Sequence, residues 1–357
     1  GTDNSFHNLT MVDVGDGRPG RRAQALVLDG IDNLVEGFDI STRGSFPYGY
    51  GDIFGKGGGS VIGHNKHSGI LIRGESIHLK DTRLFMRSYG HGIFMQGAID
   101  TLIEGCYVEG ELSTVNSVLA EEGTGSPADD VDFLTVWGFN LKDQRDYRFS
   151  LQEDGIRAYR AGQPDNLSEA RNTGDITVRD STIKFMRSGI ALGLGSGGSH
   201  YVENVTALGT ESGFWVGSNS IIVNSRGDAS VGPLYSEDAE RTGSVVELTL
   251  LDPEVSKIGN TPSFYLAGSN HDFTFKDGTS LVHSGISVQV GGLRYAHRWY
   301  DGTNDEPPPN RSANNIVIDN QMPYRLSLES SSSNTTGFSC GPIRDSGDQN
   351  DVRRECN

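Results

Sequence analysis

The sequence predicts an all-β fold, a right-handed parallel β-helix in which each coil takes up about 24 residues. The first observation is a repeat in which a small residue and a glycine precede apolar residues at alternate positions. Its anchor glycines are Gly69, Gly92, Gly155, Gly189, Gly213 and Gly285, separated by 23, 63, 34, 24 and 72 residues. The second is a further alternating segment between anchors, as in residues 174–186. The third is composition: glycine, which tolerates tight corners, supplies 48 of 357 residues, and helical periodicity is nearly absent.

The right-handed form is favoured because the coils are longer and less regular than those of the left-handed hexapeptide type. Alternate residues of each anchor strand are expected to stack in a narrow core. This predicted core comprises Ile70, Ile72, Ile93, Met95, Ile156, Ile190, Leu192, Phe214, Val216, Ile286 and Val288. The residues between them should point outward and form one face of a rod.

The chain is expected to form a single β-helix domain over residues 1–328. Long loops are predicted at 112–150 and 293–312, because the repeat is interrupted there. Residues 329–357 are predicted to be a tail closed by a Cys340–Cys356 disulfide, with Cys106 as a buried free thiol. The chain opens directly in a repeat-like segment, so we expect a preceding piece.

Charge narrows the choice of partner. The net charge of −17 argues against nucleic acid, and no apolar run approaches the length of a membrane span. Between Lys56 and His91, however, six Lys/Arg residues face only two acids, and four of the nine histidines lie in the same stretch. A local basic patch in an acidic protein predicts binding of an anionic polymer there.

Candidate catalytic residues come from this patch. Arg87 follows Lys66 by 21 residues, nearly one coil, so the two are expected on neighbouring coils. Lys66 or His91 would take a proton, and Arg87, with Arg73 or Arg157, would neutralise a carboxylate. Tyr48, Tyr50 or a histidine would donate a proton to the leaving oxygen. The residues predicted to contact substrate are Tyr48, His64, His67, Arg73, Gln96, Arg157, Tyr159, Arg187 and Trp215.

Acidic residues provide a competing site. Asp130, in the run Asp129-Asp130 with Asp132, could act with Glu153 or Asp154 as the two carboxylates of a glycosidase. No metal site and no cofactor are predicted, because metal-ligand spacing and nucleotide-binding fingerprints are absent. A calcium ion among the loop acids stays open, although the loop has no calcium-binding signature.

The glycine-anchored coils, with GHGIFMQGAIDTLIEGCYVEG at 90–110 as the clearest pair, resemble secreted right-handed β-helix polysaccharide lyases of the alginate-lyase type. The resemblance implies β-elimination on a uronate polysaccharide and a secreted or periplasmic location. Lys66, Arg87, His91 and the tyrosines Tyr48 and Tyr50 are the residues that match the types such lyases use. Gly90-His91-Gly92 is also similar to a tripeptide of β-helix pectin hydrolases. A glycoside hydrolase and a non-catalytic carbohydrate-binding solenoid therefore remain the alternatives.

Overall fold

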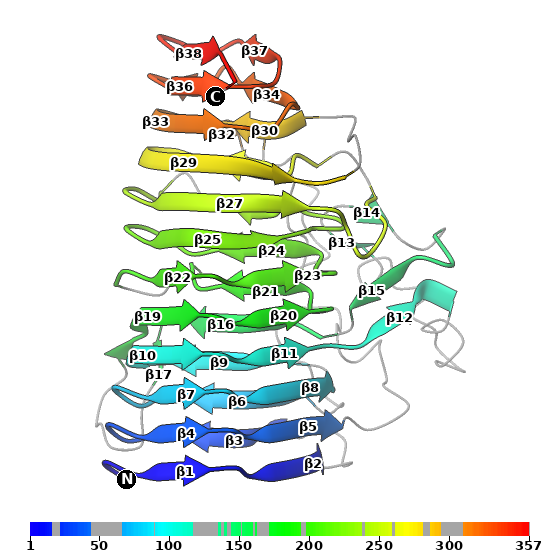
Figure 1. Cartoon of the computed structure of the whole chain (residues 1–357), viewed down its shortest axis with the longest axis vertical. Helices are drawn as coiled ribbons and strands as arrows, with labels where there is room; N and C mark the ends of the chain where they lie inside the picture. Colours follow the sequence, from blue (N-terminus) through cyan, green and yellow to red (C-terminus); the bar gives the residue numbers. More distant parts are fainter. Residues whose placement is uncertain are drawn as a thin grey trace.

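The computed structural model describes residues 1–15, 22–43, 66–88, 90–116, 135–136, 139–140, 144–150, 152–159, 161–162, 171–193, 198–237, 240–258, 261–280, 286–293 and 310–356. The chain winds into a rod with its two termini at opposite ends (Figure 1). Two long parallel sheets of 19 and 11 strands, named sheet A and sheet B, form its walls. In Figure 1 the front strands run left to right and those behind run back as the chain climbs, which is a right-handed coil. The predicted parallel β-helix is confirmed.

Sheet A takes two short strands from each of the first coils and one long strand from later ones. Its strands are β1 (Ser5–His7), β2 (Thr10–Val14), β4 (Leu34–Glu36), β5 (Asp39–Arg43), β7 (His78–Lys80), β8 (Arg83–Arg87), β10 (Ile99–Glu104), β11 (Tyr107–Glu109), β19 (Gly174–Arg179), β20 (Thr182–Lys184), β22 (Tyr201–Glu203), β23 (Thr206–Leu208), β25 (Ile221–Gly227), β27 (Val245–Leu251), β29 (Gly268–Gly278), β33 (Ala313–Asn320), β35 (Ser332–Ser333), β36 (Thr336–Ser339) and β38 (Asp351–Arg354).

Sheet B takes one strand from each coil. Its strands are β3 (Arg22–Leu28), β6 (Lys66–Ile72), β9 (Ile93–Gln96), β16 (Asp154–Tyr159), β21 (Ser188–Ala191), β24 (Ser212–Trp215), β26 (Tyr235–Ser236), β28 (Phe264–Leu266), β30 (Ile286–Val290), β34 (Arg325–Leu328) and β37 (Ile343–Asp345). Four antiparallel hairpins lie outside the two sheets: β12 (Leu112–Thr114) with β15 (Arg148–Ser150), β13 (Thr135–Val136) with β14 (Phe139–Asn140), β17 (Ala161–Gly162) with β18 (Arg171–Asn172), and β31 (Gly292–Leu293) with β32 (Asn310–Arg311).

The register of sheet B stacks the predicted core residues one coil above another. Ile70 pairs with Ile93, Ile93 with Ile156, Ile156 with Ile190, and Ile190 with Phe214. These side chains are buried within one continuous apolar core. The predicted core is therefore confirmed where its side chains are described; that of Ile286 lies outside the described residues.

The anchor glycines form a column at the corner that leads into sheet B. A Cβ atom on Gly92 would lie 2.5 Å from the carbonyl oxygen of Gly155 and 2.6 Å from a methyl group of Val108. Gly69, Gly155, Gly189 and Gly213 are enclosed in the same way by the backbone of the next coil. Only glycine fits this corner, and this requirement made the repeat recognisable in the sequence. Gly285 lies outside the described residues.

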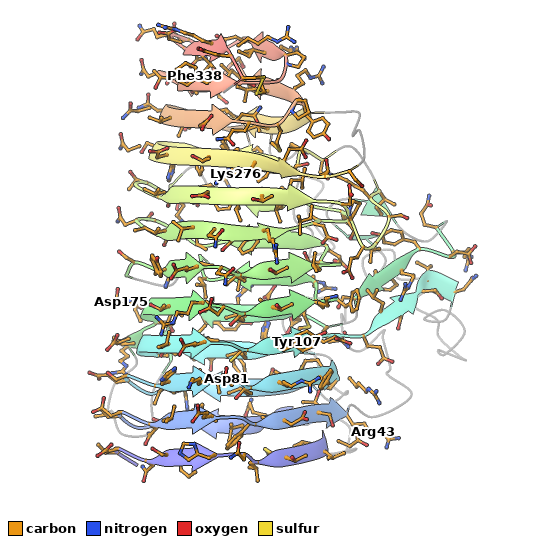
Figure 2. The ribbon with its side chains drawn as sticks, in the orientation of Figure 1. Arg43, Asp81, Tyr107, Asp175, Lys276 and Phe338 are labelled. Atoms are coloured by element: carbon orange, nitrogen blue, oxygen red, sulfur yellow. A yellow bond between two sulfur atoms is a disulfide. The ribbon has the colours of Figure 1, made fainter. Side chains whose placement is uncertain are left out.

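A second column marks the turn that divides sheet A into two strands per coil. Its members have positive φ values of 46–70° and are Asn8, Gly37, Asp81, Gly105, Asp180 and Asn204. Glycine, asparagine and aspartate tolerate this left-handed conformation best. Each member donates its backbone N–H to the coil above, as from Asp81 to the Glu104 carbonyl at 2.9 Å. Figure 2 shows Asp81 at this turn and Asp175 at the far edge of the rod.

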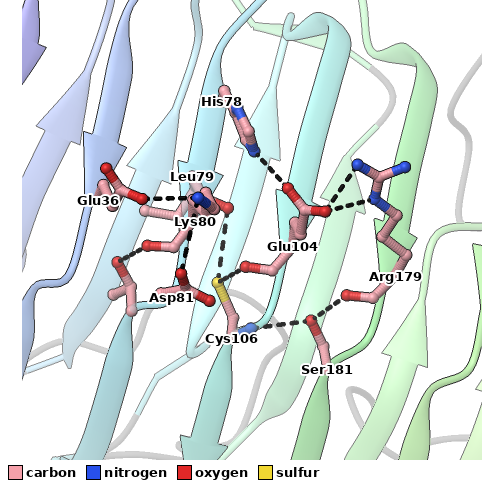
Figure 3. Close-up of polar contacts among 10 residues, drawn as sticks. Glu36, His78, Leu79, Lys80, Asp81, Glu104, Cys106, Arg179 and Ser181 are labelled. Carbon is pink, nitrogen blue, oxygen red and sulfur yellow. Dashed lines mark hydrogen bonds and ion pairs between the residues drawn. The ribbon is translucent and has the colours of Figure 1, made fainter.

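An ion-pair ladder of alternating sign crosses the outer face of sheet A. His7, Glu36, Lys80, Glu104, Arg179 and Glu203 occupy one register position on successive coils. Lys80 Nζ lies 2.7 Å from Glu36 Oε1, and Glu104 accepts from both His78 and Arg179, at 3.0 and 2.6 Å (Figure 3). Part of the predicted basic patch is thus neutralised on sheet A.

The end of the chain differs from the expected tail. Residues beyond Leu328 form β35, β36, β37 and β38, which extend both sheets, so the coils continue to Arg354. The alternating pattern there is polar, which concealed it. The predicted disulfide between Cys340 and Cys356 is present, and Cys106 is a buried free thiol, as predicted. Much of the expected loops at 112–150 and 293–312 lies outside the described residues, while β12 and β15 project sideways from the rod (Figure 1).

Candidate functional site

The outer faces of the two sheets differ in solvent exposure. Outward side chains of sheet A, such as Val245 and Val317, are 44% and 45% exposed. Several outward side chains in the middle of sheet B are buried even though they are polar or aromatic; Phe94, Tyr265 and Gln289 are 6%, 2% and 7% exposed. Buried polar groups are usually hydrogen-bonded within the protein, and those that are not often have a functional role. The outer face of sheet B is therefore the candidate site.

A histidine between two carboxylates occupies the middle of this face. Gly90-His91-Gly92 lies directly beside Glu153-Asp154-Gly155 of the next coil, because the N–H of Glu153 bonds the Gly90 carbonyl at 3.0 Å and that of Gly92 bonds the Asp154 carbonyl at 2.9 Å. His91 Nε2 lies 3.2 Å from Glu153 Oε2, and His91 Nδ1 lies 3.3 Å from Asp154 Oδ2. All three side chains are buried.

Arg157 and Tyr159 complete the cluster from the same strand, β16. Arg157 Nη1 lies 2.7 Å from Asp154 Oδ2, and its guanidinium carbon lies 4.8 Å from the centre of the Tyr159 ring. The Tyr159 hydroxyl is hydrogen-bonded to His91 Nε2, and the two rings meet edge to face with centroids 5.3 Å apart. Both side chains are partly exposed, so they connect the buried carboxylates to solvent.

A column of buried charges continues from this cluster along the rod. Glu153, Arg187 and Glu211 stand two residues before the anchor glycines of three successive coils. Their backbones are joined, since Arg187 N–H bonds the Glu153 carbonyl and Glu211 N–H bonds the Arg187 carbonyl, each at 3.1 Å. Arg187 Nε lies 3.8 Å from Glu211 Oε2, and all three residues are at most 5% exposed.

Two carboxylates of this face differ in protonation. Burial would raise the pKa of Asp154, but the Arg157 cation and the contact with His91 outweigh it and hold that pKa well below its usual range. Burial raises the pKa of Glu211 to about 7, with only partial compensation from Arg187. Asp154 therefore stays ionised at neutral pH, whereas Glu211 gains or loses its proton in that range. This split is the pattern of an acid and a base prepared for separate tasks.

The structure brings together only some of the residues predicted from sequence. His91, Arg157, Tyr159 and Arg187 share the outer face of sheet B with Trp215. Gln96 is in register with Tyr159 at its edge. Arg73 lies on the same sheet and pairs with Asp29 at 3.2 Å.

Lys66 and Arg87 are not register partners, and because the Lys66 side chain lies outside the described part of the chain, their proximity stays a prediction. Arg87 ends β8 in sheet A, is exposed, and is in register with Arg43. Lys66 begins β6 in sheet B and is in register with Arg22. The two repeated Phe-Met-Arg-Ser segments also differ, because Arg187 is buried beside Glu211 while Arg87 is not. Arg43, the register partner of Arg87, lies at the outer end of β5 (Figure 2).

Several predicted residues cannot be placed. Tyr48, Tyr50 and His64, and the acids Asp129, Asp130 and Asp132, lie outside the described residues. For Lys66 and His67 the backbone alone is described. Within the described ranges, no group of three His, Cys, Asp or Glu side chains is arranged to hold a metal ion. No helix in the described part of the chain could span a membrane.

Sequence reasoning missed Glu211, although a signal for it was present. Arg187 and Glu211 are 24 residues apart and hold the same offset from their anchor glycines as Glu153. Counting offsets from the anchors would have found this charge column.

Comparison with protein-family models and with curated proteins finds no match. Among solved structures, the chain is similar to the GH136 lacto-N-biosidase from Eubacterium ramulus, with a TM-score of 0.40 and 12% identity. That similarity covers 97% of this chain and 56% of the biosidase chain, so the chain spans little more than half of that protein's length.

Proposed function

We propose that this protein is a carbohydrate-active enzyme that hydrolyses a glycosidic bond at the outer face of sheet B. The observation that carries the proposal is a pair of buried carboxylates, Asp154 and Glu211, whose surroundings shift their pKa values in opposite directions. Glu211 would donate a proton to the leaving oxygen, and Asp154 would activate a water molecule. His91 and Arg157 would keep Asp154 oriented and ionised.

Spacing along the rod supports this division of roles. Ser188 pairs with Asp154 on one side and with Ser212 on the other, so Asp154 and Glu211 belong to coils two steps apart. Two steps correspond to about 9.5 Å between backbones. Carboxylates separated by roughly 6.5–9.5 Å leave room for a water molecule and invert the anomeric configuration. A spacing of two coils suits this longer separation better than the roughly 5–5.5 Å between the carboxyl groups of retaining enzymes, so we expect an inverting hydrolase.

The test is a panel of neutral and acidic oligosaccharides, followed for new reducing ends and for ultraviolet absorbance. Hydrolysis releases reducing ends without an absorbing product. Asp154→Asn and Glu211→Gln should each lower kcat/KM by more than about a hundredfold, or about 2.7 kcal/mol. Asp175→Asn, which changes charge equally at the edge of the rod, is the matched control. Full activity of both site variants would overturn the proposal.

Elimination is the second candidate, and the hydrogen bond between His91 and Tyr159 favours it. A histidine and a phenol beside Arg157 are groups that could move the proton of a uronate and neutralise its carboxylate. An absorbing unsaturated product, lost in Tyr159→Phe, would select this reaction over hydrolysis.

The roles predicted for Lys66, Arg87 and Tyr50 remain predictions. Arg87 is exposed to solvent, and the activity of Arg87→Ala tests its role. Binding without either product would indicate the non-catalytic alternative.

The disulfide between Cys340 and Cys356 supports a secreted or periplasmic location, because such bonds persist in oxidising compartments.

A further inference from the structure

Arg241 differs from the arginines of the proposed catalytic region in having no acidic partner among the residues that the structure describes. Arg73, Arg157, Arg171 and Arg187 each lie within 2.7–3.8 Å of a carboxylate oxygen. The guanidinium of Arg241 instead donates to the backbone carbonyl of Gly193, and no described carboxylate forms an ion pair with it. It is partly exposed, so a positive charge remains available on this face.

Trp215 lies at the same place. Its indole carbon Cδ1 and nitrogen Nε1 are 2.9 and 3.0 Å from where a Cβ atom of Gly193 would stand. Arg241 passes over Gly217, whose added Cβ would lie 4.0 Å from Nη1. Two positions without side chains thus let the indole and the guanidinium converge on one spot.

Ser236 places a buried hydroxyl group next to Trp215. It follows Trp215 in the outward column of sheet B and is in register with Tyr265. The residue is 5% exposed, and within the described part of the chain its buried hydroxyl has no hydrogen-bond partner. Buried hydroxyls are ordinarily paired, so an unpaired one beside a partly exposed tryptophan indicates a ligand.

We propose that Trp215, Ser236 and Arg241 form a subsite for an acidic sugar residue, one that carries a carboxylate or a sulfate. The indole offers an apolar face to the sugar ring, and the guanidinium fits a carboxylate or sulfate through two parallel hydrogen bonds. In a protein of net charge −17, selection of an anion must rest on such a local cation. Trp215 shares strand β24 with Ser212, the residue after Glu211, so the subsite lies on the same coil as the proposed acid. Only this relation to the acid rests on the proposed function.

The test is equilibrium binding, measured by tryptophan fluorescence in the Asp154→Asn protein so that no substrate is consumed. The probes are a uronic acid oligosaccharide with its carboxyl-reduced form, and a sulfated oligosaccharide with its desulfated form. The acidic member of at least one pair should bind more than tenfold tighter, and the better pair identifies the anion. Arg241→Met should abolish that preference, and Arg241→Lys should retain part of it. Trp215→Phe should remove the fluorescence change, and titration calorimetry of this variant should show weaker binding of both members.

Arg226→Met is the matched control, since it removes one positive charge from the exposed face of sheet A. It should leave the preference intact. Equal affinity within both pairs, or a preference that survives Arg241→Met in a folded protein, overturns the inference. A preference found in a protein that releases no product from any glycan would instead overturn the proposed hydrolysis and leave the acidic-sugar subsite standing.

Discussion

Gly92 shows how closely a single residue can be specified by the coil above it. A methyl group there would meet the Gly155 carbonyl and Val108, both fixed by the sheets. We expect Gly92→Ala to lower the free energy of unfolding by about 1–3 kcal/mol, the usual cost of overpacking a core. Urea unfolding measures the loss. Gly278→Ala is the comparison, because its nearest contacts are looser, at 2.8 and 3.0 Å, and an equal cost at both positions would contradict the argument.

Glu211 should make stability depend on pH in a defined direction. Its pKa is raised by burial from 4.5 to about 7, so the folded state binds this proton more tightly than the unfolded chain. The resulting stabilisation is complete below pH 4.5 and is lost as pH rises through 7. Between pH 5 and 8 the wild type should lose up to about 3 kcal/mol more unfolding free energy than Glu211→Gln. If the unfolding free energies of the two proteins changed in parallel between pH 5 and 8, Glu211 would be ionised throughout that range and the raised pKa would be contradicted.

The candidate site was only partly predictable, for a reason visible at Lys66 and Arg87. Their separation of 21 residues looked like one coil, but Lys66 stands three residues before its anchor glycine and Arg87 stands five before its own. Coils differ in length, so position must be counted from the glycine that fixes the corner. His91 and Asp154 share an offset of one and do meet, across an insertion that hides their proximity in the sequence.

Among the elements, the strands of sheet B were predictable because alternation is a local property. Each coil repeats the inward and outward pattern whatever lies between coils. The last coils escaped prediction because β36 and β38 contain few apolar residues, with Gly337 and Ser339 following the buried Ile318 and Asn320 of β33 and only Val352 apolar in β38. Which faces of the rod are covered depends on segments packed from elsewhere, and no local pattern records that.

The ion-pair ladder of sheet A should contribute modestly. Glu104 accepts from His78 and Arg179 at a partly exposed position. Exposed pairs of this kind are worth up to about 1 kcal/mol, and salt screens them. Glu104→Gln should therefore lower unfolding free energy by less than about 1 kcal/mol, with the difference shrinking in 0.5 M salt, a concentration of the order that screens charges within a few ångströms. Asp272→Asn, at an exposed position of the same sheet, should show no such salt dependence.

For the whole molecule, the described strands of each coil in sheets A and B pair only with those of the adjacent coils, so a local break should stay largely local. The disulfide closes a 16-residue separation, for which a stabilisation of about 3 kcal/mol is typical. Reducing it should increase hydrogen exchange in β36, β37 and β38 while sheet B near His91 stays protected. The Cys340→Ser/Cys356→Ser variant should behave the same with or without reductant. Loss of protection along the entire rod would show that the coils unfold as one unit.

The hydrogen bonds between coils run along the rod, and the termini lie at its two ends (Figure 1). A pulling force applied through the termini therefore acts first on the outermost coils, which should detach one after another. Each coil of 24 residues, the step from Ile190 to Phe214, would release about 80 Å of chain. Force spectroscopy should record a series of small steps of this size, with the disulfide-closed end yielding less length until it is reduced.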